Sequence, residues 1–198
     1  MGNLRSVQKA LQRCGGDARI VQTAEDIARA DKVVLPGVGA FKDAIERIRS
    51  HGLADPLVKA ARGGTPFLGI CLGLQMLFDV SYEDGEFRGL GVLPGKVVRF
   101  DFAADPATAD LTVPQMGWNR ISWQRPVPHL QGLEAGAYVY FCHSYYVVPE
   151  DDSIVATSTD YGLQYASSIW KDNVFATQFH PEKSQSVGLK ILENFVRM

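Results

Sequence analysis

Apolar and polar positions along the first half of the chain follow two different periods. Three short apolar runs have the length of buried strands, and they occupy residues 18–21, 32–35 and 66–71. Between and before these runs the apolar residues recur at helical spacing, from Leu4 to Leu11, after the capping residue Thr23, at 41–51 and at 53–62. Strands that alternate with helices in this way predict a parallel sheet with helices on both faces.

The second half of the chain, from Gly95 onward, is richer in strand patterns. They cover residues 96–100, 111–116, 138–142, 145–148, 154–158, 167–171 and 174–179, and a last helix is predicted over 185–196. The small, acidic stretch 103–109 is typical of an exposed loop. We therefore expect an α/β fold in a single domain over residues 1–198. Its sheet should be doubly wound and mostly parallel, with helices on both faces and antiparallel additions.

The composition narrows the classes of function. With 198 residues, 46% hydrophobic content and a net charge of −2, the chain can form one globular core and shows no basic stripe for nucleic acid. No apolar run approaches the roughly 20 residues of a membrane span, and no charged and then apolar leader opens the chain. The three cysteines lack metal-ligand spacing and suit a reducing compartment. We expect a soluble, cytoplasmic protein that binds no metal.

The strongest chemical signal is Cys71, within the segment Gly69-Ile70-Cys71-Leu72-Gly73. An apolar strand leads into this segment and a helical stretch, 74–78, follows it, which predicts a sharp strand-turn-helix elbow. Such an elbow places the cysteine above the carboxyl end of a strand and at the amino end of a helix, where the helix dipole favours a thiolate. We predict that Cys71 is a nucleophile, whereas Cys14 and Cys142 should be small buried apolar residues.

A base and an orienting acid follow far downstream, in His180-Pro181-Glu182. The rigid proline lets Glu182 reach back to His180 and fix the tautomer of its ring, as the acid of a Ser-His-Asp triad does. Each of these residues alone would be an ordinary surface or cap residue. Together with Cys71 they predict a thiol triad.

A loop with two glycines, Pro36-Gly37-Val38-Gly39, follows the apolar run 32–35. In an acyl-transfer enzyme this loop, at Val38 and Gly39, would supply one donor of the oxyanion hole, and the N–H of Leu72 would supply the other. From the loop alone, an ordinary strand-to-helix turn is the favoured interpretation. A P-loop is not indicated, since no Lys or Ser/Thr completes one.

These motifs resemble those of the class I, triad-type glutamine amidotransferases. The resemblance rests on Gly-Ile-Cys-Leu-Gly-Leu-Gln at 69–75, His-Pro-Glu at 180–182 and Pro-Gly-Val-Gly at 36–39. Within this class, the segments 2–7, 114–119, 140–146 and 179–185 are similar to the glutaminase subunits of imidazole glycerol phosphate synthases, and the similarity runs from Gly2 to Val196. The elbow and His-Pro-Glu imply glutamine hydrolysis, while the other segments indicate the branch that serves histidine biosynthesis.

The resemblance implies a role for each matching residue. Cys71 would attack the glutamine amide and form a glutamyl thioester, His180 would protonate the departing ammonia and then activate water, and Glu182 would orient His180. The family positions that hold the substrate's polar groups fall on Gln75 and Glu83, and the backbone at Ser144 and Tyr145 matches the segment that binds its carboxylate. The positions that meet a (β/α)₈-barrel cyclase, which receives the ammonia within a heterodimer, fall on Asn3, Trp118, Asn119, Tyr140 and Lys183. No metal or organic cofactor is implied.

The sequence departs from the family at its beginning. Family members normally begin with an apolar strand and Asp-Tyr-Gly before Met-Gly-Asn, and this sequence starts at that methionine. We therefore expect the first strand of the sheet to be missing. Its two neighbours would then have unpaired N–H and C=O groups, at a cost of about 1–3 kcal/mol for each buried group.

Three other functions remain open from the sequence. The first is a glutaminase that serves another synthase, of the anthranilate or guanylate type, and co-purification with that synthase would indicate it. The second is a thiol peptidase or esterase on a similar elbow, which would turn over peptides or esters without a partner. The third is a non-catalytic binding subunit, against which the intact triad argues.

Overall fold

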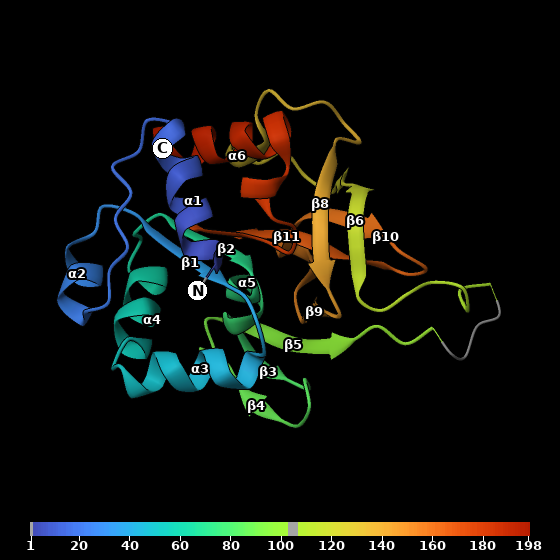
Figure 1. Cartoon of the computed structure of the whole chain (residues 1–198), viewed down its shortest axis with the longest axis horizontal. Helices are drawn as coiled ribbons and strands as arrows, with labels where there is room; N and C mark the ends of the chain where they lie inside the picture. The colour runs from blue at the N-terminus through green and yellow to red at the C-terminus, as the bar shows by residue number, and fades with distance from the viewer. Residues whose placement is uncertain (1, 103–106) are drawn as a thin grey trace.

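The computed structural model describes residues 2–102 and 107–198, with side chains from Leu4 onward (Figure 1). Its largest sheet contains, in spatial order, β1 (Val33–Gly37), β2 (Phe67–Cys71), β12 (Val174–Thr177), β11 (Gln164–Lys171), β10 (Val155–Asp160) and β7 (Ser122–Trp123). The strands β1, β2 and β12 are parallel, and the remaining pairs are antiparallel. The three parallel strands therefore have their carboxyl ends on the same side of the sheet, and this is where ligands bind in open α/β sheets.

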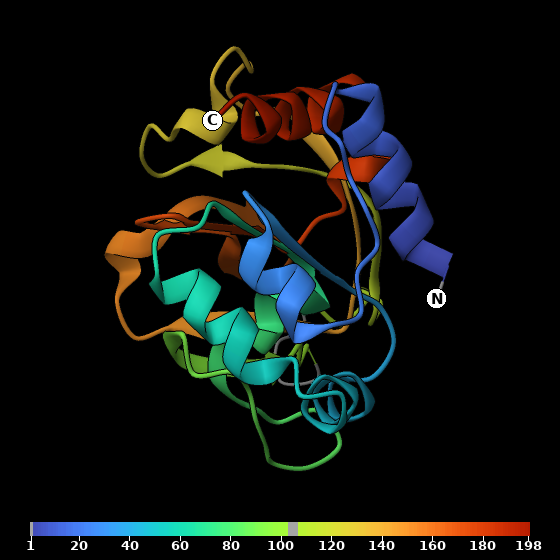
Figure 2. The same cartoon turned by 90° about the vertical axis from the view of Figure 1, so that its left-hand side faces the viewer.

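Helices cover both faces of this sheet, as predicted (Figure 2). One face carries α1 (Gly2–Arg13) and α6 (Gln185–Arg197), and the other carries α2 (Ala24–Arg29), α3 (Phe41–Ser50) and α4 (Ala54–Arg62). Because side chains alternate along a strand, Phe67 enters the core beneath α2, α3 and α4, and its neighbour Leu68 enters the core beneath α1 and α6. None of the helices in the described ranges is long and apolar enough to cross a membrane.

Two smaller sheets extend the central one. The first contains β4 (Phe87–Arg88), β3 (Phe78–Ser81), β5 (Leu93–Arg99) and β9 (Tyr145–Pro149), in that order, and the second is a ribbon of β6 (Gln115–Arg120) and β8 (Tyr138–His143). Short 3-10 turns occupy η1 (Pro128–Leu130), η2 (Asp152–Ile154) and η3 (Pro181–Lys183). Ser144 alone separates β8 from β9, so one continuous segment connects the ribbon to the other small sheet.

The strand predicted at residues 18–21 is wrong. This segment forms no strand, and Ile20 and Val21 are each 42% exposed. Within the described residues, β1 lies at the edge of the sheet and pairs with β2 alone. A ladder needs a neighbouring strand, and the segment 18–21 has none beside it.

Other differences concern where elements begin and end. The helix expected at 74–78 is α5 (Leu72–Met76), because Phe78 instead begins β3 and pairs with Leu93 of β5. Strand β6 begins at Gln115 rather than at residue 111. The loop predicted at 103–109 falls partly outside the described residues, since 103–106 are not among them, and Ala107 and Ala109 are exposed. The cap of α2 is confirmed, because the Thr23 hydroxyl accepts the N–H of Asp26 at 3.1 Å.

Candidate active site

Cys71 lies at the sharp turn between β2 and α5, as predicted. Its backbone has φ 55° and ψ −107°, a conformation that costs a non-glycine residue about 1–3 kcal/mol. The flanking glycines are required by their neighbours: a Cβ at Gly73 would lie 1.8 Å from the Leu35 carbonyl oxygen, and one at Gly69 would lie 2.9 Å from the Cβ of Ala176. The turn is thus enclosed by β1 and β12, and it holds Cys71, 8% exposed, above the carboxyl ends of the parallel strands.

His180 reaches Cys71 from the turn that follows β12. Its backbone N–H donates to the Tyr140 carbonyl in β8 at 2.9 Å, and its side chain is hydrogen bonded to Cys71. The ring Nδ1 lies 2.9 Å from Oε1 of Glu182 in η3. Since a carboxylate only accepts hydrogen bonds, Nδ1 carries a proton and Nε2 faces the sulfur. The structure therefore brings the three residues of the predicted triad together.

The charges of the triad compensate one another in a buried site. His180 is 2% exposed, and the side chain of Glu182 is fully buried. Burial lowers the pKa of His180, but hydrogen bonds and charge interactions with Cys71 and Glu182 outweigh it and raise the pKa to about 9. At neutral pH the imidazolium is therefore favoured, and the site holds a proton that a leaving amine can take.

The predicted oxyanion loop lies against the elbow. Gly37 of β1 is the register partner of Cys71, and a Cβ at Gly37 would lie 2.8 Å from the Cβ of Leu72. Beyond it, Val38 is 47% exposed, and Gly39 has φ 93°, which favours glycine. The residues predicted to form the oxyanion hole, Val38, Gly39 and Leu72, thus lie on adjacent segments at the carboxyl ends of neighbouring strands.

Gln75 of α5, predicted to hold substrate, is almost fully buried and bonded within the protein. Its Nε2 donates to the Tyr145 carbonyl at 2.9 Å and to Oε1 of Gln178 at 3.1 Å. The same Tyr145 carbonyl also accepts Nδ1–H of His143 at 2.8 Å. The segment at Ser144 and Tyr145, predicted to bind the substrate carboxylate, is therefore fixed by two side-chain donors.

Glu83 connects the segment after β3 to the oxyanion loop. Its Oε2 accepts the N–H of Phe41 at 3.0 Å, and Phe41 is the first residue of α3, two positions after Gly39. Burial raises the pKa of Glu83, and the bond from Phe41 opposes that effect. The pKa of Tyr145 is raised mainly by burial and further by the charges of Asp84 and Glu83. Glu83 therefore lies near the segment predicted to bind the substrate carboxylate.

Of the predicted partner residues, Trp118 and Tyr140 lie on one face of the β6–β8 ribbon, and Asn119 lies on the other. The rings of Trp118 and Tyr140 are 6.1 Å apart between centroids, and Nζ of Lys183 lies 5.6 Å from the Tyr140 centroid. Asn119 points away from them, since neighbouring residues alternate along a strand, and it donates to the Asp160 carbonyl in β10 at 2.8 Å. Asn3 lies in α1, but its side chain is outside the described part of the chain.

Two buried residues without a motif role in the sequence contact this site. Gln178 is fully buried, and its Nε2 lies 3.6 Å from Sγ of Cys71. His143 is 6% exposed, and burial, aided by the nearby His180, lowers its pKa to about 4. One feature of the sequence could have identified Gln178. It is a long polar residue between the buried residues Thr177 and Phe179, two positions before the triad histidine.

Known proteins are similar to this chain in sequence and in fold. Residues 2–198 match the family model for class-I glutamine amidotransferases. The chain is 54% identical to the imidazole glycerol phosphate synthase subunit HisH of Syntrophotalea carbinolica, over 98% of this chain and 95% of that protein. It is 50% identical to the subunit of the same name from Aquifex aeolicus, over 100% of this chain and 92% of that protein. Among solved structures, PurLQS of Thermotoga maritima has the same fold, with a TM-score of 0.71 at 19% identity, over 98% of this chain and 91% of that one. With its full length matched and its cysteine elbow in place, the chain belongs to the class-I glutamine amidotransferase family.

Proposed function

We propose that the chain is the glutaminase subunit of an imidazole glycerol phosphate synthase, with Cys71, His180 and Glu182 as its catalytic triad. The observation that carries this proposal is the buried triad on a strained elbow, in a chain about half identical to HisH subunits. The name of those relatives favours this synthase over one of the anthranilate or guanylate type. The family favours glutamine over a peptide or ester as substrate, and the intact triad argues against a non-catalytic subunit.

The first half of the reaction forms a thioester. The thiolate of Cys71 attacks the carboxamide carbon of glutamine, and the carbonyl electrons move to the oxygen, where the N–H groups of Leu72 and of the loop at Val38 and Gly39 stabilise the charge. As the C–N bond breaks, His180 gives its Nε2 proton to the nitrogen. Ammonia leaves, and the glutamyl group stays on the sulfur.

The second half of the reaction hydrolyses the thioester. The neutral His180 takes a proton from water, and the water oxygen attacks the thioester carbon. The C–S bond breaks, glutamate leaves, and Cys71 returns as a thiolate beside the imidazolium. Glu182 keeps the other proton on Nδ1 throughout, so that Nε2 alone exchanges protons.

Glutamine is bound, in this proposal, between the elbow and the segment that joins β8 to β9. The backbone at Ser144 and Tyr145 binds the substrate carboxylate, and Glu83 and Gln75 act on its other polar groups. Two side-chain donors fix the Tyr145 carbonyl, and Glu83 is bonded to the start of α3. These bonds support a preformed site, which reduces the ordering needed on binding.

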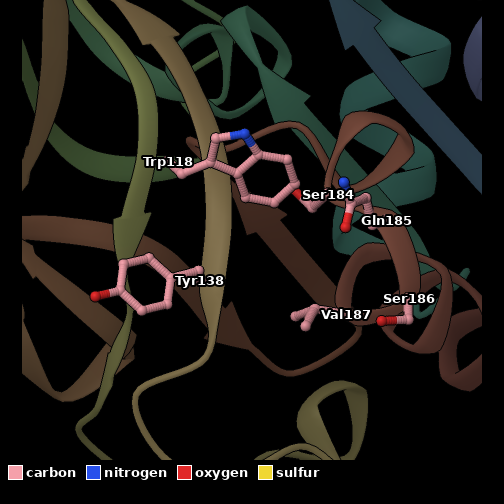
Figure 3. A pocket seen from close by; sticks show the side chains of 6 residues that line it. All are labelled: Trp118, Tyr138, Ser184, Gln185, Ser186 and Val187. Carbon is pink, nitrogen blue, oxygen red and sulfur yellow. The ribbon is translucent and has the colours of Figure 1, made fainter.

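The partner is proposed to be a (β/α)₈-barrel cyclase, which docks on the outward face of the β6–β8 ribbon to form a heterodimer. This face exposes large side chains, with Met116 at 64%, Trp118 at 46% and Tyr138 at 51% exposure. A cavity of about 250 Å³ opens there between Trp118, Tyr138 and residues 184–187 at the start of α6 (Figure 3). Aromatic side chains around a cavity are typical anchors of a protein interface.

The decisive experiment measures glutamate release from glutamine by the chain, with and without the barrel cyclase and its ribonucleotide ligand, for the wild type and for Cys71→Ala. We expect strong stimulation by the ligand-bound cyclase and no release from Cys71→Ala under either condition. A purified pair that uses ammonium but never glutamine would refute the proposal.

A further inference from the structure

We propose that Gln178 is a further catalytic residue: its side-chain amide donates a hydrogen bond to the sulfur of Cys71 and favours the thiolate, while Gln75 fixes the orientation of that amide. The inference rests on the proposed role of Cys71 as the nucleophile. It assigns a function to a residue outside the triad, the oxyanion donors and the predicted substrate contacts.

Gln178 is held rigidly next to the nucleophile. It directly follows the last residue of β12, and its backbone N–H donates to the Ser167 carbonyl in β11 at 2.8 Å. The side chain is fully buried, with Nε2 at 3.6 Å from Sγ of Cys71 and Oε1 accepting from Gln75 at 3.1 Å. A distance of 3.6 Å suits a hydrogen bond to sulfur, whose radius exceeds that of oxygen.

The chain of bonds decides which end of the Gln178 amide faces the sulfur. The backbone carbonyl of Tyr145 can only accept a hydrogen bond, so the amide group that meets it at 2.9 Å must be the NH₂ of Gln75. The same NH₂ meets Gln178, so Gln178 must present its oxygen there. The NH₂ of Gln178 is then directed at Cys71, and turning either amide over would place two donors or two acceptors against each other.

The surroundings of the sulfur favour its ionised form. Hydrogen-bond donors reach it from His180 and Gln178, while the Cys142 carbonyl, which could accept the proton of a thiol, lies at the long distance of 4.0 Å. A thiol would offer its own proton to neighbours that are mainly donors, whereas a thiolate accepts from both. Hydrogen bonds to an ionised acceptor are the stronger kind.

Other titratable groups near the sulfur act through these donors. Glu182 bonds to the far side of His180, and His143 in β8 lies close enough to His180 that His180 helps to lower the pKa of His143. The Tyr145 carbonyl accepts a hydrogen bond from Gln75, and it therefore acts on the sulfur only through that amide. Gln178 is therefore the uncharged donor at the sulfur, and its effect should not depend on its own titration.

The role of Gln75 follows from the same bonds. Both protons of its amide are used inside the protein, one toward Tyr145 and one toward Gln178. Gln75 thus acts as a positioning residue for Gln178, in addition to any contact it makes with glutamine. It also ties the segment proposed to bind the substrate carboxylate to the nucleophile.

The test is the rate at which iodoacetamide alkylates Cys71 in the full-length chain across the neutral pH range, followed by mass spectrometry of the peptide that contains Cys71. Peptide-level detection separates this cysteine from Cys14 and Cys142. The variants are Gln178→Leu, which removes the donor, Gln178→Glu, which places an acceptor at the sulfur, and Gln75→Leu, which frees Gln178 to turn. Asn194→Leu is the control, because it removes an amide of α6 that makes two hydrogen bonds to the segment around η1.

We expect Gln178→Leu to lower the alkylation rate of Cys71 at neutral pH by about tenfold or more, the size expected for a lost hydrogen bond to an ionised acceptor. The rate profile should move to higher pH, further in Gln178→Glu and less in Gln75→Leu. Asn194→Leu should leave the profile in place. The thermal midpoint of each variant shows whether it is folded, and Gln75→Leu keeps the test valid if a substitution at Gln178 prevents folding.

Each outcome decides the question. A wild-type profile in a folded Gln178→Leu variant would make Gln178 a packing residue and overturn the inference, as would an equal shift in Asn194→Leu. If the wild-type Cys71 is not alkylated faster than Cys142, the proposed nucleophile itself is wrong. Reactive wild-type Cys71 with no effect of Gln178→Leu would refute only this inference.

Discussion

His180 connects the proton chemistry of the site to the stability of the fold. Burial lowers its pKa, but Cys71 and Glu182 together raise it to about 9, against an ordinary value of 6.5. At 1.36 kcal/mol per pH unit, the protonated ring is worth about 3 kcal/mol to the folded state. Because this gain remains after burial has lowered the pKa, Cys71 and Glu182 together contribute more than it, each through a hydrogen bond and a charge.

The substitution Glu182→Gln removes the charge part of the Glu182 contribution and keeps the hydrogen bond. The amide oxygen of glutamine can still accept Nδ1–H of His180, so the shape of the triad is kept and the negative charge is lost. We expect the pKa of His180 to fall by about one unit, measured by NMR titration of the ring. Turnover with the cyclase should fall by about 10²-fold or more, because the imidazolium formed in the reaction loses its counter-charge.

The same substitution should change the pH dependence of stability. Because the pKa of His180 is raised in the folded state, its stabilisation is fully present below pH 6.5 and is lost as the pH rises toward about 9. The free energy of unfolding in urea should therefore fall over this window in the wild type, by up to about 3 kcal/mol, and by less in Glu182→Gln. An unchanged ring titration, with equal slopes of stability against pH, would refute this account of the charges.

Three further outcomes are expected. Gly73→Ala would place a Cβ 1.8 Å from a backbone carbonyl oxygen of β1 and should lower the urea midpoint strongly, whereas Gly16→Ala, which meets its nearest side chain at 3.2 Å, should change it little. Burial lowers the pKa of His129 to about 4, so its contribution to stability is present above pH 6.5 and lost as the pH falls toward 4; in His129→Phe this acid-side loss of stability should be smaller. Trp118→Ala should weaken binding of the cyclase in calorimetry by about tenfold or more, while Tyr82→Ala, an equally exposed residue outside the ribbon, should not; equal effects would contradict the proposed docking face.

The triad could be predicted from the sequence because its geometry is almost local. The elbow needs only a strand, two glycines and a following turn, and Glu182 reaches His180 across a single proline. The one contact that is not local, between Cys71 and His180, follows from β2 and β12 being adjacent parallel strands with their carboxyl ends together. The apolar pattern of these two strands was sufficient to predict that both are buried in the sheet.

The support around the triad could not be predicted in the same way. The bonds among Gln75, Tyr145 and Gln178 join α5, β9 and the end of β12, and no local pattern states that these elements meet. The failure at residues 18–21 has a related cause, because strand formation there depends on a neighbour in the sheet and not on the apolar run itself. Tertiary pairing decides both cases.

Strand β8 serves the proposed interface and the active site at once, because its side chains alternate. Tyr138 and Tyr140 face outward on the ribbon, while His143 is buried and bonds to the Tyr145 carbonyl. The backbone carries the connection further, since the Tyr140 carbonyl accepts the N–H of His180, and the Tyr140 N–H donates to Oγ of Ser184, which in turn donates to the His180 carbonyl. A cyclase bound to the outer face would therefore contact the strand whose Tyr140 carbonyl is hydrogen bonded to His180. Its contact with Tyr140 would act one hydrogen bond away from His180, which gives docking a short physical route to the rate of glutamine hydrolysis.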